Sequence, residues 1–246
     1  MERAAEALKL SRPSAAQRLS AFVRRGWLAR VRQGLYLVLP LEALPGTPTS
    51  AEDPWVVAAE AFAPCYIGGW SAAEHWEFTE QIFRSTFVVT AASLRHRQQT
   101  LLGADFHLVS ASTHRVGSVA PNVWRARVRV AVSNPARTIA DALAAPEWVG
   151  GVRPLTHVLR SYRESRHWRS TELLREVEEL GRGAAWKRLG YLSEMLWPED
   201  SVIAARAHSR RSTGVIRLDP AIPSRGRLNK RWGLWLNARV GPENDT

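Results

Sequence analysis

The chain has 246 residues, of which 45% are apolar and 23% are charged, as expected of a globular protein with a sizeable hydrophobic core. No run approaches the roughly 18 apolar residues of a membrane helix, and the N-terminus lacks the basic and then apolar pattern of a secretory signal. A single cysteine, Cys65, excludes an internal disulfide framework and a cysteine-rich zinc site. These observations predict a soluble, cytoplasmic protein that has no membrane partner.

Positive charge is concentrated near the N-terminus. The chain contains 34 Lys and Arg against 23 Asp and Glu, a net charge of +11. Residues 1–50 carry eight basic and three acidic side chains, so a fifth of the chain holds nearly half of the excess. Such a local excess is typical of a segment that binds nucleic acid.

The first 26 residues predict two helices separated by a short break. Helix-forming residues occupy 3–10, and the next four residues, Ser11-Arg12-Pro13-Ser14, interrupt them. We expect the interruption because proline disfavours helix in the residue before it and serine caps the helix that follows. Apolar residues return at helical spacing over 14–25, and Gly26 is suited to ending that helix.

A hairpin is predicted to follow the second helix. Residues 27–31 and 35–39 are short strand-like runs, and Arg32-Gln33-Gly34 between them favours a tight turn. Helix, turn, helix and hairpin is the order of a winged helix-turn-helix. We therefore predict a DNA-binding domain of this type over residues 1–45.

Polar side chains gather on one face of the predicted helix at 14–25. Ser14, Gln17 and Arg18 are three and four residues apart, so they share a stripe, which Arg25 extends. In a major groove Gln can read adenine and Arg can read guanine. The other candidates flank this helix or lie at the hairpin tip: Arg12, Arg24, Arg30, Arg32 and Gln33. The alternative is a solvated helix face followed by a charged turn.

The remainder of the chain predicts a second domain of mixed structure. Four prolines between positions 40 and 54 indicate a connection, so we place a linker at 46–53 and the second domain at 54–246. Predicted helices begin at Asp53-Pro54 and at the Ser71–Glu74 capping box, and further helices are expected at 135–145, 154–165, 171–180 and 184–196. Predicted strands lie at 87–91, 106–109, 124–132, 214–218 and 231–237. The predicted fold class is α+β, an N-terminal winged helix-turn-helix followed by a mixed α/β C-terminal domain.

Residues with catalytic or metal-ligand spacing are not found in the sequence. The seven histidines show no His-x-x-x-His pattern, and Cys65 beside Pro64 is more typical of a core thiol than of a nucleophile. Asp219 followed by Lys230 is only loosely similar to the carboxylate–lysine sets of nucleases. A basic stripe on the strand at 124–132, formed by Arg125, Arg127 and Arg129, is a further candidate contact surface. We predict no catalytic residues, no metal site and no cofactor.

Five blocks of sequence, in order along the chain, together resemble the AbiEi-like antitoxins of type IV toxin–antitoxin (abortive infection) systems. Pro135, Arg137 and Asp141 in the third block match the pattern of that family. The blocks are SAAQRLSAFVRRGWLARVRQGLYLV at 14–38, YIGGWSAAEHWEFTEQI at 66–82, SNPARTIADAL at 133–143, KRLGYLSEML at 187–196, and RLDP at 217–220 together with RWGLWLN at 231–237.

The resemblance implies a two-domain antitoxin that performs no catalysis. Its N-terminal winged helix would bind double-stranded DNA at inverted repeats in the promoter of its own operon. Its C-terminal domain would counteract a nucleotidyltransferase-like toxin. The winged helix of the family has a further helix before the one at 3–10, so we expect either that the true start lies upstream or that the domain here lacks its first helix. The alternatives are a plain transcriptional regulator, whose second domain dimerises or senses a signal, and a restriction-like nuclease.

Overall fold

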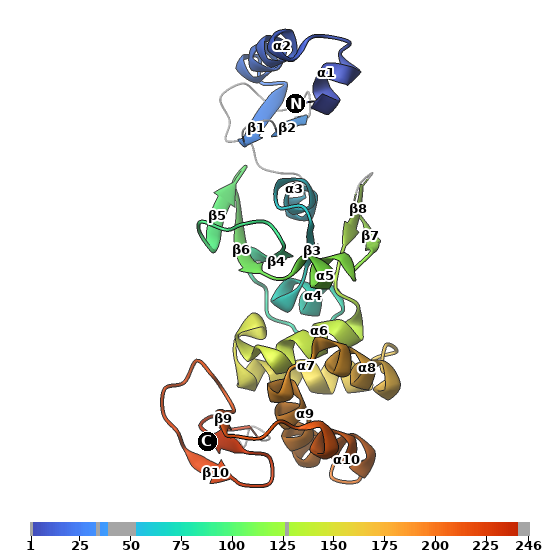
Figure 1. Cartoon of the computed structure of the whole chain (residues 1–246), viewed down its shortest axis with the longest axis vertical. Helices are drawn as coiled ribbons and strands as arrows, with labels where there is room; N and C mark the ends of the chain where they lie inside the picture. The colour runs from blue at the N-terminus through green and yellow to red at the C-terminus, as the bar shows by residue number, and fades with distance from the viewer. Residues whose placement is uncertain (1, 33–34, 39–52, 126–127, 241–246) are drawn as a thin grey trace. The chain divides into compact units, whose positions relative to one another are not determined.

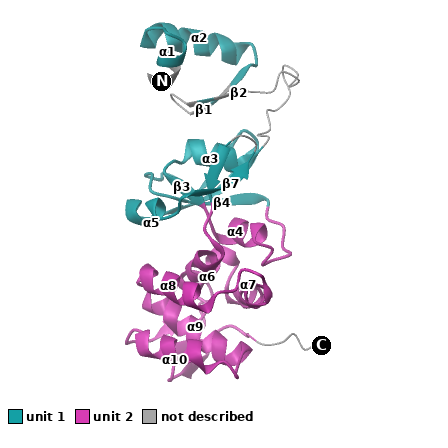
Figure 2. Ribbon diagram, turned by 90° about the vertical axis from the view of Figure 1, so that its right-hand side faces the viewer, with its two compact units in different colours: residues 1–66, 84–131 teal, residues 67–83, 132–246 magenta. Residues whose placement is uncertain are grey.

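A computed structural model describes residues 2–32, 35–38, 53–125 and 128–240 (Figure 1). The structure is mixed α+β, which confirms the predicted fold class at that level. Contacts divide the chain into two compact units, residues 1–66 with 84–131 and residues 67–83 with 132–246 (Figure 2). Both units therefore include part of the predicted second domain, whereas the predicted linker at 46–53 lies outside the described residues except for Asp53. None of the helices in the described part of the chain has the length and apolarity needed to cross a bilayer.

The N-terminal segment contains two helices and a hairpin in the predicted order. Its elements are α1 (Glu2–Ala7), α2 (Arg12–Arg24), β1 (Leu28–Arg32) and β2 (Leu35–Val38), and the two strands pair antiparallel. Helix α2 begins two residues before the predicted start, because Ser11 rather than Ser14 is the cap and Pro13 is accommodated in the first turn. Gly26 ends α2 as predicted, with φ of +73°.

Unit 1 contains a four-stranded sheet with the strand order β3-β4-β6-β5. Strand β4 runs parallel to β6, and β5 runs antiparallel to β6. Helix α3 is capped by Asp53, whose carboxylate accepts the Trp55 N–H at 2.8 Å, as the Asp-Pro pair predicted. Phe62, just after α3, packs edge-on against Phe106 of β6. The bounds are α3 (Pro54–Ala61), β3 (Cys65–Ile67), β4 (Ser85–Thr90), β5 (Gln98–Leu101), β6 (Ala104–Ser110) and α5 (Thr113–Gly117).

The single strand predicted at 124–132 is wrong. The structure has two antiparallel strands there, β7 (Pro121–Arg125) and β8 (Val128–Ala131), with Trp124 opposite Arg129. The alternation of apolar and polar residues continues through Ala126-Arg127, which contains none of the residues that usually mark a turn. The sequence pattern therefore did not reveal the reversal.

Unit 2 is mainly helical and ends in a small sheet. Its helices are α4 (Gly69–His75), α6 (Pro135–Ala144), the 3-10 helix η1 (Pro146–Val149), α7 (Val152–Glu164), α8 (Ser170–Leu180), α9 (Gly183–Leu196) and α10 (Ser201–Arg210). The sheet has the order β10-β11-β9, formed by β9 (Ile216–Arg217), β10 (Arg227–Asn229) and β11 (Leu234–Leu236). The four helices predicted between 135 and 196 are confirmed. The capping box predicted at Ser71 is wrong, since α4 begins at Gly69 and Ser71 is buried within it.

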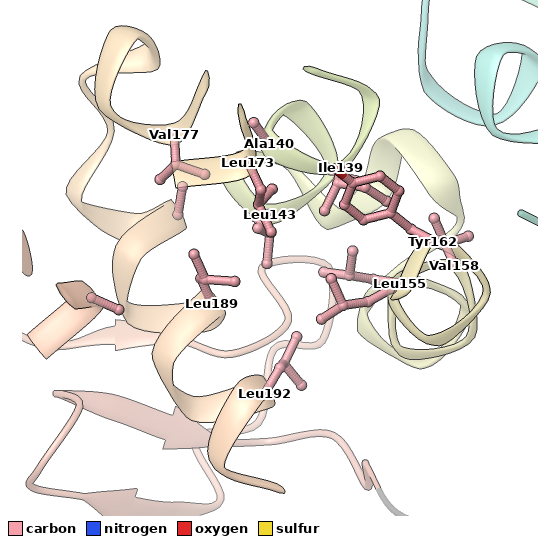
Figure 3. Packing of buried hydrophobic residues seen from close by; sticks show 14 of the residues in the cluster. Ile139, Ala140, Leu143, Leu155, Val158, Tyr162, Leu173, Val177, Leu189 and Leu192 are labelled. Carbon is pink, nitrogen blue, oxygen red and sulfur yellow. The ribbon is translucent and has the colours of Figure 1, made fainter. Parts of the chain in front are cut away.

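The core of unit 2 is formed by apolar faces of α6, α7, α8 and α9 (Figure 3). Leu143, Leu155 and Leu189 come from three of these helices and are fully buried. Trp232, which precedes β11, is also fully buried, and its ring lies directly against Gly190 of α9. Its Nε1–H donates to Glu194 Oε2 at 2.6 Å. The missing side chain at position 190 therefore makes room for the indole.

We expect Gly190→Ala to reduce the free energy of unfolding by about 1–3 kcal/mol, because the added methyl group would overlap the Trp232 ring in a closely packed core. Gly117→Ala in α5 is the control, since a Cβ there meets no atom within 4 Å. Urea denaturation followed by circular dichroism would measure both variants. Equal stability of the two would show that the indole moves aside without cost.

Candidate nucleic-acid interface

The polar face predicted on the second helix is exposed in the structure. Ala15 and Leu19 of α2 are buried at 0% and 6% exposure, which fixes the inner side of the helix. Ser14, Gln17 and Arg18 are exposed together on one stripe of α2, as their spacing predicted. The structure therefore brings together three of the nine predicted contact residues.

Ser14 belongs to the helix cap as well as to the exposed stripe. Its Oγ lies 2.9 Å from Ser11 Oγ, and its backbone N–H donates to Ser11 Oγ at 3.4 Å. The side chains of Gln17 and Arg18, in contrast, have no hydrogen bond or ion pair with any residue in the described ranges. Both are therefore available to a ligand, and Arg18 carries the positive charge of the stripe.

The end of α2 is joined to the hairpin by aromatic contacts. The rings of Phe22 and Trp27 lie 5.5 Å apart between centroids, and the Arg25 guanidinium lies 5.3 Å from the Trp27 centroid. The Gly26 N–H donates to Val23 O and the Trp27 N–H to Phe22 O, each at 3.0 Å. This pairing closes the helix end and directs the chain into β1. Arg25 is thus held against the indole.

The remaining predicted contacts are distributed around this stripe. Arg12 begins α2, Arg24 ends it, and Arg30 lies in β1; all three are exposed. Arg32 is the last residue of β1, and the register shifts between Arg30 and Arg32. The prediction for Gln33 falls outside the described residues, as does the side chain of Arg32.

The second predicted basic stripe, at 125–129, is engaged in contacts of its own. The Arg125 guanidinium lies 4.1 Å from the Trp55 ring centroid, and its Nε is 3.7 Å from Asp53 Oδ2. The Arg129 guanidinium lies 5.6 Å from the centroid of Trp124, its partner across the β7–β8 pair. Arg125 therefore packs within unit 1, whereas Arg129 and Trp124 are both exposed and Arg127 lies outside the described residues.

Asp219, the carboxylate of the nuclease alternative, has a structural role. Its Oδ2 accepts the Val152 N–H at 2.9 Å and thereby caps α7, while its Oδ1 accepts the Ala221 N–H at 3.0 Å. Asp219 is only 5% exposed, and Lys230 lies in the turn between β10 and β11. Among the described residues, no group of three or more His, Cys, Asp or Glu side chains could hold a metal ion.

Cys65 was predicted to be a core thiol, and the structure shows it partly buried rather than in the core. Its thiol donates to Ala58 O at 3.3 Å, and burial raises its pKa to about 12. The thiolate, which is the nucleophilic form, is therefore disfavoured at neutral pH.

The block at 133–143 supplies a buried ion-pair network in unit 2. Arg137 Nε donates to Asp141 Oδ1 at 3.1 Å, and its NH1 donates to Glu176 Oε2 of α8 at 3.3 Å. Asn134 caps α6 by accepting the Arg137 N–H at 2.7 Å and donates to Glu176 Oε1 at 3.1 Å. Arg137, Asp141 and Glu176 are each no more than 6% exposed. These residues join α6 to α8.

The block at 187–196 supplies a second buried cation. Arg188 of α9 donates to Leu143 O and Ala144 O at the end of α6, and to Arg217 O and Leu218 O, over 2.8–3.1 Å. Burial lowers the pKa of Arg188 to about 10. The blocks at 133–143 and 187–196 therefore contribute buried polar side chains that join segments of unit 2.

Because residues 1–50 were compared with the rest of the chain as a whole, a second excess of positive charge at residues 201–240 was missed. Residues 51–200 contain 17 basic and 17 acidic side chains, whereas residues 201–240 contain nine basic residues and Asp219 as their one acidic residue. The positive excess of the chain is thus located in two segments, and the C-terminal one is the larger. Counting charges in successive windows would have found it.

Removing the Arg137 side chain is expected to take the buried cation away from the Asp141 carboxylate and to leave Glu176, among the described residues, with only the exposed Arg175 as a cation, at 3.5 Å. We expect Arg137→Ala to reduce the free energy of unfolding by about 3–5 kcal/mol. Arg206→Ala is the control, because Arg206 and its partner Glu178 are about half exposed and such pairs contribute roughly 0–1 kcal/mol. Chemical denaturation of the two variants tests this. A similar small effect at both positions would contradict the assignment of Arg137 to the core network.

Comparison with known proteins shows similarity of fold. No family model and no curated protein sequence matches the chain. Among solved structures, the chain is similar to the RV2827C protein from Mycobacterium tuberculosis, with a TM-score of 0.59 and 17% sequence identity. The similarity covers 89% of this chain and 78% of that one. The two proteins therefore share a fold over most of their lengths.

Proposed function

We propose that the N-terminal segment is a winged helix-turn-helix that binds double-stranded DNA, with α2 as the recognition helix and β1–β2 as the wing. The observation that carries the proposal is the exposed stripe of α2, where Gln17 and Arg18 are free of other partners within the described residues. Both side chains have the donors needed to contact base edges in a major groove. In this proposal Arg24 and Arg30, which are both exposed, contact phosphates beside the groove.

We further propose that the protein is an antitoxin that represses its own operon and counteracts a nucleotidyltransferase-like toxin. The five sequence blocks that resemble the AbiEi-like antitoxins support this, since four of them lie outside the DNA-binding segment. In this proposal the protein acts in the cytoplasm, by binding rather than by catalysis. A regulator without a toxin remains the alternative, and the two differ in what the remainder of the chain does.

Arg18 and Arg24 should affect DNA binding in different ways. We expect Arg18→Ala to cost about 1–3 kcal/mol of operator affinity and to relax the preference at one base position. Arg24→Ala should weaken binding to all sequences alike and reduce the slope of affinity against salt by about one unit. Fluorescence titrations with operator and scrambled duplexes measure both effects. Arg206→Ala, which removes a charge from an ion pair of unit 2, is the control. An unchanged operator preference in Arg18→Ala would show that α2 is not the recognition helix.

Repression and protection from the toxin should be separable in the full chain. The double variant Arg18→Ala/Arg24→Ala should lose repression of its promoter because its DNA contacts are removed. It should still protect cells that express the toxin-like gene of the same operon, because the other family-like blocks are intact. A promoter reporter and a growth assay measure the two activities. A wild-type chain that represses but does not protect would favour the plain regulator. Loss of protection in a folded double variant would contradict the division proposed here.

A further inference from the structure

The C-terminal forty residues of the described chain form a basic surface with few acidic partners. Arg206 and Arg210 pair with Glu178, and Arg231 pairs with Glu194. Five further basic side chains are exposed and have no ion pair with any residue that the structure describes: Arg217, Arg225, Arg227, Lys230 and Arg239. Asp219, the one acidic residue between 201 and 240, is buried. This surface therefore has positive charge that unit 2 does not neutralise.

The β10-β11-β9 sheet has one face on the core and one face away from it. Leu234 is fully buried in the core cluster, and Ile216, its partner in β9, packs against the same cluster. Side chains alternate along a strand, so Trp235 lies on the opposite face. Trp235 is directly paired in register with Arg217 on one side and with Leu228 on the other. Neither Trp235 nor Leu228 belongs to the core cluster.

Two arginines flank the indole on this outer face. Arg217 is its neighbour in β9, and the Arg225 guanidinium lies 6.0 Å from the Trp235 ring centroid. Trp235 is partly exposed, and both arginines are exposed. An aromatic ring between cationic groups can stack on a nucleobase while the cations contact the adjacent phosphates.

This combination favours unpaired bases over a duplex. In a duplex the faces of the bases are stacked on one another, so only their edges are accessible to side chains. In loops and bulges of RNA the bases are splayed out and commonly stack on aromatic side chains. An acidic protein surface would satisfy the arginines but would not by itself require the ring between them.

We propose that the outer face of the β10-β11-β9 sheet binds a single-stranded segment of RNA. Trp235 stacks on a base, and Arg217 and Arg225 contact the phosphates on either side. This binding is separate from the proposed contact of α2 with duplex DNA and does not depend on it. The protein then has two nucleic-acid surfaces that differ in the kind of strand they accept.

The test measures binding of the full chain to a fluorescein-labelled single-stranded RNA of about 12 nucleotides by anisotropy. Trp235→Ala should weaken binding about ten-fold or more, and Trp235→Phe should retain most of it because the ring can still stack. Arg217→Gln and Arg225→Gln should each reduce the salt slope by about 0.7. Arg206→Gln is the matched control, since it removes the same charge from an ion pair on α10 and should leave the slope unchanged. Arg18→Ala should leave RNA binding unchanged.

Four results would overturn the proposal. One is the absence of RNA binding, and another is equal affinity of Trp235→Ala and the wild type. Equally tight binding of single-stranded or duplex DNA of the same sequence would show that the surface does not select RNA. Equally effective competition by polyglutamate would instead assign the surface to an acidic protein partner. Urea denaturation checks that each variant is folded; if Trp235→Ala is not, Trp235→Phe and the two arginine variants decide the outcome.

Discussion

The buried guanidinium of Arg188 is the contact on which the organisation of unit 2 depends. Its nitrogens donate to carbonyl groups at the end of α6 and at Arg217 and Leu218, so one side chain joins α9 to two other segments. Removing a cation from water is costly unless its donors are satisfied, and here four carbonyl oxygens satisfy them. Asp219, which follows Leu218, in turn caps α7. The position of the β10-β11-β9 sheet in unit 2 therefore depends on buried polar contacts as well as on apolar packing.

The N-terminal segment is stabilised differently. Among its side chains whose burial is described, Ala5, Ala15 and Leu19 are the buried apolar ones, which is a small core. Backbone hydrogen bonds at the ends of α1 and α2 add to the stability that this small core provides. The Leu10 N–H donates to Ala5 O at 2.9 Å, and the Trp27 N–H donates to Phe22 O in the same pattern. The turns after α1 and α2 are thus stabilised by backbone hydrogen bonds. The polar side chains of α2 are not needed for these turns, so they can contact a ligand.

The two proposed surfaces use arginine in different chemical settings. On α2, Arg18 stands beside Gln17 on a helix narrow enough to enter a major groove, so its donors can meet base edges. On the C-terminal sheet, Arg217 and Arg225 flank Trp235, so the ring supplies a stacking surface and the arginines supply charge. The arginines of the β7–β8 pair are instead engaged with Trp55 and Trp124. Clustered arginine in the sequence therefore corresponds to three different roles.

Features that depend only on neighbouring residues were predictable from the sequence. Asp53-Pro54, Asn134-Pro135 and Gly26 predicted two helix starts and one helix end correctly, because caps act over one turn of chain. The stripe of Gln17 and Arg18 followed from helical spacing alone. The charge of residues 201–240 was also present in the sequence, although a single division at residue 50 concealed it.

Features that require distant segments to meet could not be predicted from the sequence. The capping of α7 by Asp219 joins residues 67 positions apart. The Trp235 surface arises because β9, β10 and β11 pair in one register, which places Arg217 beside the indole. The reversal between β7 and β8 was hidden because alternation on a strand looks the same whether the chain continues or turns back. Local propensity has no information on such pairings, since they are set by the burial of faces contributed by separate segments.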